Sequence, residues 1–590
     1  MCGIYGYYNF DKTRKCSIDL REMARLLHHR GPDGIGMYED GSAGIGNVRL
    51  AIIDPEGGGQ PFYSDDKMVV VVQNGEIFNF KELKKELEID GVIFHTHCDT
   101  EVLVHLYLKY GYEFLNKLNG MFSIAIFDKS KDEMFIARDR IGEKPLYFSK
   151  TESQYIFSSE IKGLLPYVDK KVNYTAINAY LRLNYVPSPL TAFDGVYHVE
   201  PGTYQIIKRD GSVVTAIWWS LANQEINYHK NEGEWISEFN SLLEDSVKIR
   251  LESDVPFGAF LSGGVDSTSV VGLMAKNMKQ PAKTYSIGFP DPRFDESHYA
   301  QMAADRFKTD HHCEIVGYDI VSEWEDFIYH CDQPHGDVSF MPMRKVSEIA
   351  SKDVKMVLTG DGADELFAGY EKYVPVFSNE KLAGASIETL KKEYLPYLTL
   401  FDDEKLRVLW KKSLHTKIDW NVVDKAFIET FNEVQHFDAI NKALYFDMKY
   451  LLSGNNLVKP DRMAMAESLE TRAPFLDYRM MEFAFTMPGR FKLVNGETKY
   501  LYKKAVTPLI GEELAYRKKQ MFTVPIGEWF RTELSKYCNQ ILLSEDSHLL
   551  TLLNKVEIER MLEEHLVGKA NNTREIRALI SLELWLKIFF

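Results

Sequence analysis

Residues 256–267 read PFGAFLSGGVDS, an apolar strand candidate that enters two glycines and then a helical run through Met274. Glycines at such a junction let the backbone approach a phosphate closely, and the start of the helix supplies N–H donors and a favourable dipole. The chain contains no GxxxxGK followed by Ser or Thr, so this is not the loop that serves γ-phosphate transfer. A glycine-rich turn is often only a tight connection, but Asp266 would also place a carboxylate where Mg²⁺ bridges phosphates. The pattern favours a loop that binds phosphate groups.

Two further apolar strand candidates, Thr284–Phe289 and Val354–Leu358, follow this loop with helical stretches between them. Strands that alternate with helices predict a parallel sheet with helices on its faces. After residue 460 the pattern is mostly helical. We therefore expect the second half to be an α/β parallel-sheet domain with a helical C-terminal part.

A second polar loop, TGDGADELFAGY at 359–370, follows the strand candidate Val354–Leu358. Its carboxylates Asp361, Asp364 and Glu365 would repel one another unless a positive group balances them. A solvated acidic turn would explain the same residues. Loops that follow parallel strands nevertheless open at the same carboxyl edge of the sheet, where such folds bind ligands. We therefore expect this loop to face the glycine loop at 262–267.

The first half has a different pattern of short strands and turns. The β-branched run Met68–Val72 enters an expected turn at Gln73–Gly75, and residues 122–127 and 134–137 predict a hairpin. One helix candidate, Lys81–Leu87, lies among these strands. This half is expected to be an α+β layered domain with antiparallel sheets.

The chain has 590 residues, too many for one hydrophobic core. The hydrophobic pattern loosens between about Asp210 and Glu232, so we expect domains at residues 1–212 and 230–590. A net charge of −16 weighs against a general nucleic-acid binder. The sequence has no apolar run of about 18 residues, and we expect no membrane span.

The six cysteines form no CxxC pair and no repeating spacing, so neither a disulfide framework nor a zinc knuckle is expected. The start of the chain lacks the basic and apolar regions of a secretory signal, which favours a cytoplasmic location. His95, His97 and Cys98 could suggest a metal site. However, alternating histidines without further ligands nearby are weak evidence, and we do not expect one there.

Cys2 directly follows the initiator methionine, and its side chain is small enough for that methionine to be removed. The chain would then carry a thiol and a free α-amine on one residue. An α-amine has a pKa of about 7.7–8.0, against about 10.4 for lysine, so it can accept the thiol proton near neutral pH. Taken alone, Cys2 would be better explained as one more small buried residue.

Cys2 is accompanied by four segments in a fixed order: HRGPDG at 29–34, NVRLAIID at 47–54, QNGEIFN at 73–79 and CDTE at 98–101. Together they resemble the class II glutamine amidotransferases. The resemblance implies an Ntn-hydrolase-type layered sandwich in which Cys2 attacks the side-chain amide of glutamine.

The same resemblance implies roles for single residues. Arg49 would bind the glutamine α-carboxylate, for which a guanidinium offers a planar fork, and Asp99 would bind the α-amine. Asn74 and Gly75 would form the oxyanion hole, with Glu76 beside them in the glutamine site. Each has a simpler explanation alone: a surface salt bridge for Arg49, a type I′ turn for Asn74-Gly75 and a helix cap for Asp99.

The second half resembles the N-type ATP pyrophosphatases, and the whole chain resembles the glutamine-hydrolysing asparagine synthetase family. Ser286–Phe289 matches the strand that holds adenine, and Asp461–Asp477 matches a helical signature near the acceptor substrate. Asp266 and Asp364 would be the Mg²⁺ carboxylates. The residues implied to bind ATP are Leu261, Ser262, Gly263, Gly264, Asp266, Ser267, Ile287, Thr359 and Gly360.

Asp361 and Lys499 would support catalysis at the ATP site. Asp361 stands where many members of the family carry a Glu that supports formation of the aspartyl-adenylate. Lys499 aligns with the lysine that stabilises charge at that step, although an exposed lysine is usually only solubilising. In RKKQMF at 517–522, Met521 departs from the Gly that is usual in this closing motif.

The resemblance implies an enzyme that releases ammonia from glutamine through a thioester at Cys2 and uses ATP and Mg²⁺ to activate aspartate. Its products would be asparagine, glutamate, AMP and diphosphate, its partners these small molecules and, by family expectation, a second copy of the chain. A sister amidotransferase acting on another carboxylate, such as a uronic acid in surface-polysaccharide synthesis, would keep the same motifs. The acceptor pocket around Arg462–Asp477 would distinguish the two.

Two other classes are disfavoured. A plain hydrolase with a regulatory second half would not need the intact loops at 262–267 and 361–365. A non-catalytic binding protein would need neither Cys2 nor these loops.

Overall fold

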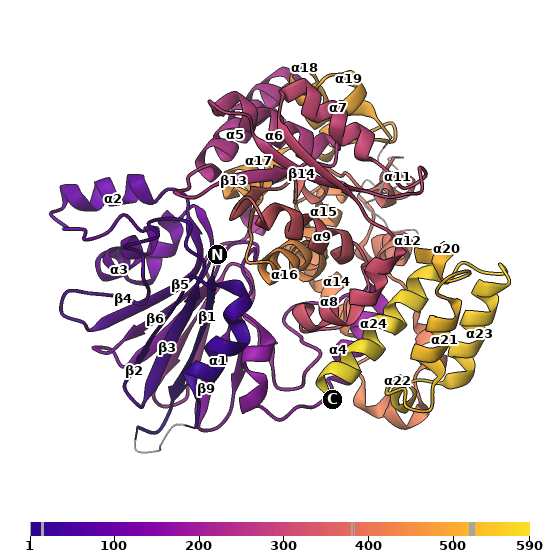
Figure 1. The fold of residues 1–590 in the computed structure, drawn as a ribbon, viewed down its shortest axis with the longest axis horizontal. Helices are drawn as coiled ribbons and strands as arrows, with labels where there is room; N and C mark the ends of the chain where they lie inside the picture. The colour runs from indigo at the N-terminus through magenta and orange to yellow at the C-terminus, as the bar shows by residue number, and fades with distance from the viewer. Residues whose placement is uncertain (1, 13–16, 379–381, 383, 519–525) are drawn as a thin grey trace.

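The computed structural model describes residues 2–12, 17–378, 382, 384–518 and 526–590, except for the side chains of residues 318 and 319. It contains two regions built on different sheets, with the N-terminal region in indigo to purple and the rest in magenta to yellow (Figure 1). Within these residues no helix has the length and apolar character needed to cross a membrane.

The described residues of the N-terminal region form twelve strands and four α-helices. Its first sheet has the order β10-β8-β9-β1-β3-β2, and its second sheet has the order β12-β11-β7-β6-β5-β4. The bounds are β1 Cys2–Asn9, α1 Leu20–Leu27, β2 Gly34–Glu39, β3 Ala43–Arg49, β4 Phe62–Tyr63, β5 Val69–Ile77, α2 Phe80–Ile89, α3 Asp99–Tyr110, β6 Gly120–Asp128, β7 Glu133–Arg138, β8 Tyr147–Lys150, β9 Gln154–Ser158, α4 Tyr174–Leu183, β10 Tyr197–His198, β11 Thr203–Lys208 and β12 Val213–Ile217.

The two antiparallel sheets stack on each other and carry helices on their outer faces. Ile4 and Tyr8 of β1 pack against Val70 of β5 in the other sheet, whereas Tyr5 of β1 packs on the side of α1. Successive side chains of a strand point to opposite faces, so a strand covered on both sides must be apolar throughout. β1 is buried along its whole length and carries apolar or aromatic residues from Cys2 to Tyr8, with the polar Asn9 only at its end. The expected Ntn-hydrolase-type layered sandwich is confirmed.

The second region is built on a five-stranded sheet of order β15-β14-β13-β16-β17, in which every pairing is parallel. Helices α5 and α6 cover one face, and α8, α9 and α16 cover the other. The bounds are α5 Glu232–Arg250, β13 Phe257–Phe260, α6 Val265–Asn277, β14 Lys283–Gly288, α7 Ser297–Phe307, β15 Asp310–Ile315, α8 Trp324–Cys331, α9 Phe340–Ser351, β16 Met356–Leu358, α10 Ala363–Leu366, α16 Val458–Ala466 and β17 Glu470–Arg472.

The C-terminal part is helical, as expected; its last helices, α20 to α24, lie at the right of the molecule, whereas α18 and α19 lie at the top (Figure 1). Its helices are α17 Tyr478–Thr486, α18 Tyr500–Ile510, α19 Glu512–Tyr516, α20 Ile526–Trp529, α21 Ser535–Leu543, α22 Leu549–Leu552, α23 Lys555–Leu566 and α24 Thr573–Phe589. Together with the parallel sheet, this confirms the α/β fold class of the second half.

The turn expected at Gln73–Gly75 is wrong, because β5 continues through these residues to Ile77 and pairs Gly75 with Phe122. Gly75 has a φ of +142°, and a Cβ there would lie 1.9 Å from the carbonyl oxygen of Met121. The glycine therefore permits a close approach between two strands and not a chain reversal.

Several elements were not expected from the sequence. These are helices α1, α3 and α4, the edge strands β15 and β17, and the interruption of the expected helical signature at 461–477 by β17. β17 has only three residues, and β15 is polar and largely exposed because it lies at the edge of its sheet. The boundary between 212 and 230 stays a prediction; β12 pairs with the N-terminal sheet as far as Ile217, and α5 begins at Glu232.

Candidate active sites

The loop between β13 and α6 approaches neighbouring backbone closely. Gly263 has a φ of +69°, and a Cβ there would lie 2.4 Å from the backbone carbonyl carbon of Tyr299. Only glycine fits this position without displacing α7. Ser262 Oγ lies 3.1 Å from Ser267 Oγ and accepts a hydrogen bond from the Gly264 N–H (3.3 Å), so the two serines close the loop over the start of α6.

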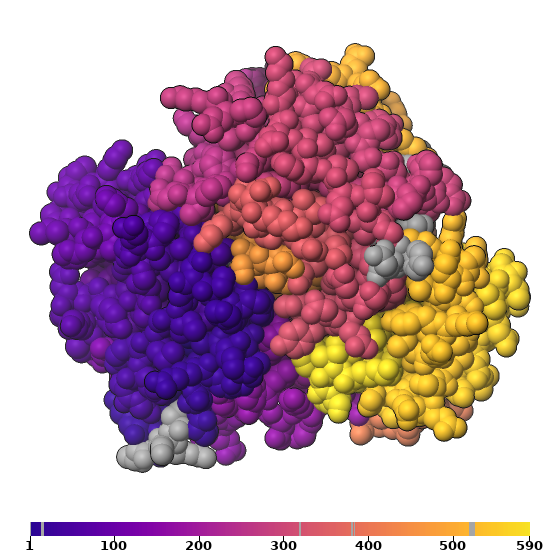
Figure 2. Space-filling view, in the orientation of Figure 1, coloured from indigo at the N-terminus to yellow at the C-terminus, as the bar shows by residue number. Residues whose placement is uncertain are grey.

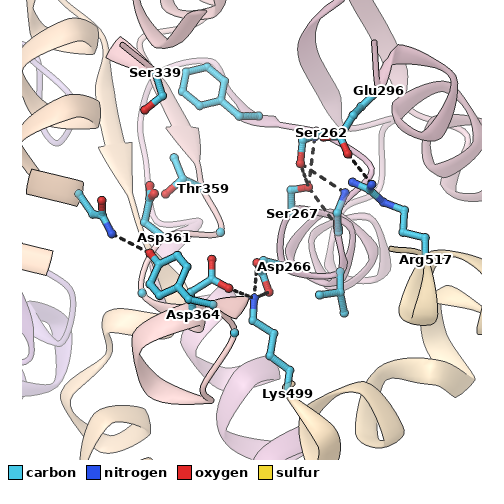
Figure 3. Close-up of a pocket in the computed structure, with 18 of the residues that line it drawn as sticks. Ser262, Asp266, Ser267, Glu296, Ser339, Thr359, Asp361, Asp364, Lys499 and Arg517 are labelled. Carbon is cyan, nitrogen blue, oxygen red and sulfur yellow. Dashed lines mark hydrogen bonds and ion pairs between the residues drawn. The ribbon is translucent and has the colours of Figure 1, made fainter. Parts of the chain in front are cut away.

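This loop borders a cavity of about 850 Å³ at the carboxyl edge of the parallel sheet. Asp266, Asp364 and Lys499 meet at its base, the loop with Ser262 and Ser267 forms one wall, and Asp361 and Thr359 lie opposite (Figure 3). Both loops expected to face each other therefore do so. The cavity is lined by all the residues expected to bind ATP except Gly263, namely Leu261, Ser262, Gly264, Asp266, Ser267, Ile287, Thr359 and Gly360.

Lys499 joins the two carboxylates expected to hold Mg²⁺. Its Nζ lies 2.7 Å from both carboxylate oxygens of Asp266 and 2.7 Å from Oδ1 of Asp364. The side chain is buried, which alone would lower the pKa of Lys499, but the two carboxylates outweigh burial and raise it. The expectation that such acidic loops need a positive group is confirmed by this geometry.

The donor set at this position fits Mg²⁺. Asp266 and Asp364 converge on one cation position, and the described residues contain no group of three or more His, Cys, Asp or Glu side chains that could hold a metal. Mg²⁺ is commonly held by one or two carboxylates together with substrate phosphates. The site therefore suits a metal ion that arrives with phosphate oxygens.

The other carboxylates of the acidic loop have separate environments. Burial raises the pKa of Asp361, and nearby Asp266 and Asp364 add to the rise. Burial also raises the pKa of Glu365, which accepts hydrogen bonds from the Tyr370 hydroxyl (2.6 Å) and from an amide N–H of Asn456 (2.5 Å). The loop thus presents Asp361 and Asp364 to the cavity, while Glu365 is tied to its wall.

Two polar contacts in the cavity wall were not identified from the sequence. Lys459 Nζ donates to Asp337 Oδ2 (2.6 Å) and to Ser339 Oγ (2.9 Å), and all three residues line the cavity. Arg517 Nε donates to the carbonyl oxygen of Gly263 (2.8 Å), which anchors the glycine loop. Each partner lies far away in the chain, and of these residues only Arg517 and Gly263 lay in motifs that the sequence singled out. Residues 519–522 of the motif at 517–522, including Met521, lie outside the described residues.

Cys2 lies at the other site, buried at the start of β1. Its backbone nitrogen donates to Asn74 Oδ1 (3.0 Å), so the Asn74 amide is oriented with its NH₂ group on the opposite side. In the sheet, Cys2 is opposite Arg49. Burial raises the pKa of the Cys2 thiol, which needs a base to become a nucleophile near neutral pH. The structure brings together Cys2, Asn74 and, next along β5, Gly75.

Arg49 and Asp99 make local contacts beside Cys2. Arg49 donates through Nη1 and Nη2 to the carbonyl oxygens of Ile53, Asp54 and Pro55 at 2.7–3.0 Å, so this loop holds the guanidinium in place. Asp99 Oδ2 accepts the Ile77 N–H at 2.9 Å, which ties the start of α3 to the end of β5. Burial raises the pKa of Asp99.

Glu76 follows Gly75 in β5 and contacts the second region. Its carboxylate is 3.6 Å from Nη2 of Arg472, and Arg472 Nε also donates to Glu470 (2.6 Å). Burial, Asp99 and Glu470 raise the pKa of Glu76 well above its usual value. Glu76 is thus placed at the contact between the two regions, where a short strand that the sequence did not reveal, β17, reaches it.

A buried ionic network crosses the same contact. Arg30 Nε donates to the carbonyl oxygen of Cys2 (3.0 Å), and its two terminal nitrogens bind Asp461 of α16 at 2.8 and 3.0 Å. Arg30 also binds Glu160 (2.8 Å), which in turn pairs with Arg462 (2.7 Å). The segment that carries α16 is the orange surface between the two regions in Figure 2. Helix α16 therefore binds Arg30, which holds the carbonyl oxygen of Cys2, and it reaches the ATP-site cavity through Lys459.

Comparison with known proteins matches both halves of the chain. The family model described as Asparagine synthase matches residues 238–587, and the model described as Glutamine amidotransferase domain matches residues 1–219. Asparagine synthetase (glutamine-hydrolyzing) 1 of Bacillus subtilis is 32% identical, with 99% of this chain and 96% of that protein aligned. A putative asparagine synthetase (glutamine-hydrolyzing) of Mycobacterium bovis is 31% identical, with 96% and 93% aligned.

Among solved structures, the glutamine phosphoribosylpyrophosphate amidotransferase of B. subtilis in complex with ADP and GMP is similar over part of this chain. It is 20% identical and covers 53% of this chain and 65% of its own, with a TM-score of 0.28. We base no argument on this likeness.

Proposed function

Because the chain belongs to the glutamine-hydrolysing asparagine synthetase family, we propose that it uses glutamine and ATP to convert aspartate into asparagine. Members of the family are carbon–nitrogen ligases with glutamine as the amide donor, and this enzyme class applies to the chain. The proposal adds the acceptor, the residues and the order of chemical events.

At the first site, Cys2 Sγ would attack the side-chain amide carbon of glutamine once its proton has moved to the α-amine of the same residue. The developing oxyanion would be held by the Asn74 NH₂ group and the Gly75 N–H. The Cys2–Asn74 contact supports this role because it orients the amide. Ammonia leaves as the thioester forms, and water then releases glutamate from Cys2.

Glutamine would be positioned by the remaining charged groups of this site. Arg49 has five N–H donors, and those not bound to residues 53–55 would bind the α-carboxylate. Asp99 would accept the α-ammonium, and the glutamine charge would stabilise its ionised form. Glu76 would support the glutamine site indirectly, through its contact with Arg472 of the second region.

At the second site, a carboxylate oxygen of the acceptor would attack the α-phosphorus of ATP, and diphosphate would leave. The loop at 262–267 would bind the leaving phosphates through its N–H groups and the start of α6. When bound through Asp266 and Asp364, Mg²⁺ would neutralise charge on these phosphates. Lys499 would add positive charge as the adenylate forms, and Asp361 would face the acceptor. Ammonia from the first site then attacks the acyl carbon and AMP leaves.

The observation that carries this proposal is the meeting of Asp266, Asp364 and Lys499 beside the glycine loop at one sheet edge. A phosphate-binding loop with two convergent carboxylates and a lysine suits cleavage of ATP next to a carboxylate acceptor.

The acceptor is tested by incubating the protein with glutamine, ATP and Mg²⁺ and adding either aspartate or glucuronate. We expect AMP and diphosphate only with aspartate, together with asparagine. AMP that appears with glucuronate and not with aspartate would assign the chain to a sister amidotransferase. Glutamate release with no AMP under any condition would contradict the ligase chemistry.

A further inference from the structure

Three carboxylate oxygens lie at the same distance from the ammonium nitrogen of Lys499. Both oxygens of Asp266 and Oδ1 of Asp364 lie 2.7 Å from Nζ. The two aspartates come from different elements, the first turn of α6 and helix α10. A cation that bound both aspartates would have to occupy the space that this ammonium fills, because their oxygens converge there.

The backbone holds the lysine in this position. Lys499 has a φ of +55°, unusual for a residue other than glycine, and its N–H donates to the carbonyl oxygen of Phe367 (3.2 Å) as α18 begins. Gly369 lies beside the side chain: a Cβ there would be 2.3 Å from Lys499 Cε and 1.9 Å from Asp364 Oδ1. The surroundings therefore leave space for the lysine chain against Asp364, and the side chain is only 3% exposed.

We propose that Lys499 occupies the metal position of the nucleotide-free site, so that a divalent cation binds to Asp266 and Asp364 only together with a nucleotide. The proposal rests on the assignment of this cavity as the ATP site. In the free protein the ammonium balances the two carboxylates, and a metal ion alone would have to displace it without offering it a new partner. Phosphate oxygens supply that partner, so the lysine moves to the phosphates when metal and nucleotide arrive together.

This exchange gives the lysine a positioning role before it stabilises any reacting group. Without it, two carboxylates that converge on one point would repel each other or attract a metal ion in the absence of ATP. With it, the empty site is neutralised by an internal cation, and the metal-bound site is formed only around the substrate.

The test is binding of Mn²⁺ to the full chain without nucleotide, measured by electron paramagnetic resonance of free Mn²⁺. Lys499→Met removes the ammonium and should bind Mn²⁺ at least about tenfold more tightly than the wild type. Lys504→Met is the matched control: Lys504 lies on α18, the helix that begins after Lys499, but it pairs with Glu232 (2.9 Å) and does not line the cavity, so its removal should leave Mn²⁺ binding unchanged.

Thermal denaturation gives a second readout that does not depend on activity. Mn²⁺ alone should raise the Tm of Lys499→Met and leave that of the wild type unchanged, because only the variant exposes its carboxylates to the metal. Lys499→Gln, which keeps a polar side chain of similar length, should behave in the same way if the Met variant does not fold.

Equal binding of Mn²⁺ alone to wild type and both Lys499 variants would overturn the inference. A parallel experiment with Mn²⁺ and the non-cleavable α,β-methylene analogue of ATP separates this from a failure of the proposed function. If the wild type binds Mn²⁺ with the analogue but the variants gain no binding without it, only the role of Lys499 is wrong. If the wild type holds no Mn²⁺ even with the analogue, the metal assignment fails and the inference with it.

Discussion

Burial raises the pKa of the Cys2 thiol, so the thiol remains protonated near neutral pH until a base removes its proton. The backbone nitrogen of Cys2 lies against Asn74 Oδ1, next to the strand residues proposed to stabilise the oxyanion. A free α-amine at this nitrogen would be a base placed on the nucleophile's own residue. At the scale of single residues, the proposed glutamine chemistry therefore places the nucleophile and its base on Cys2.

Cys2→Ala should lower glutamine-dependent synthesis by at least about a thousandfold while ammonia-dependent synthesis stays within about twofold. The substitution removes the nucleophile, whereas it alters none of the residues that line the ATP cavity. Rates with each nitrogen source check this, with Cys538→Ala, a buried cysteine in α21, as the control that keeps both activities. A folded Cys2→Ala protein that has lost the ammonia-dependent reaction would refute the separation of the two sites.

A second buried lysine makes a prediction about stability. Burial lowers the pKa of Lys492 to about 7, partly offset by Asp438, and its Nζ donates to Asn441 Oδ1 (2.7 Å). In the unfolded chain the pKa is about 10.4. Between about pH 7 and 10.4 the unfolded state therefore binds more protons than the folded state, and the free energy of unfolding should rise with pH.

Lys492→Met removes this dependence. The free energy of unfolding of the wild type minus that of the variant should increase by a few kcal/mol, to order of magnitude, between pH 7 and pH 10. Denaturant unfolding at both pH values measures it, and titration of other groups cancels in the difference. Parallel pH dependence of the two proteins would show that Lys492 is charged in the folded state.

At the scale of elements, strand–loop–helix units that carry their own local signal could be predicted from the sequence. The unit from β13 to α6 has an apolar run, two glycines and a helical pattern, and its residues line the cavity as expected. β17 has three residues and gains its strand conformation only by pairing with β16, which no local pattern encodes. The strand conformation of Gln73–Gly75 was missed because Asn-Gly favours turns, whereas pairing with β6 overrides this preference.

The same reason explains which site residues could be predicted. Cys2, Asn74, Asp266, Asp364 and Lys499 lie in motifs, and the structure brings Cys2 to Asn74 and brings Lys499 to Asp266 and Asp364. Arg30 pairs with Asp461, and Lys459 pairs with Asp337. In both pairs the partner is more than a hundred positions away in the chain. The first pair results from packing of the two regions against each other and the second from packing within the second region, so charge and spacing along the sequence reveal neither.

The prediction at the scale of elements concerns the contact that helix α16 makes with Arg30. Asp461→Asn removes one partner of the buried Arg30 and should lower the free energy of unfolding by about 3 kcal/mol. Because Arg30 also holds the carbonyl of Cys2, glutamine-dependent synthesis should fall more than ammonia-dependent synthesis. Denaturant unfolding and the ratio of the two rates measure these effects.

The control for this variant is Lys355→Met, which breaks a more exposed contact between the regions, with Asp33 at 2.7 Å. It should change stability by no more than about 1 kcal/mol and leave the ratio of rates unchanged. An equal fall of both rates in Asp461→Asn would mean that α16 supports the ATP cavity and not Cys2.

At the scale of the whole molecule, the two sites are built by different regions but share one buried contact. Arg30, Glu76 and Glu160 come from the N-terminal region, and Asp461 and Arg472 come from the second. Charges buried in this way destabilise a structure when a partner is removed, so the contact ties the two regions in one arrangement. In the proposed reaction, ammonia would form at Cys2, which is joined through Arg30 to the helix whose residue Lys459 borders the ATP cavity.

The most direct test of the account follows the amide nitrogen. The full chain is incubated with glutamine labelled with ¹⁵N in its amide, together with ATP, Mg²⁺ and aspartate, and all products are quantified. The account predicts ¹⁵N in the side-chain amide of asparagine, with glutamate, AMP and diphosphate formed in equal amounts. Labelled ammonia and glutamate without labelled asparagine, or AMP formation that does not depend on aspartate, would contradict it.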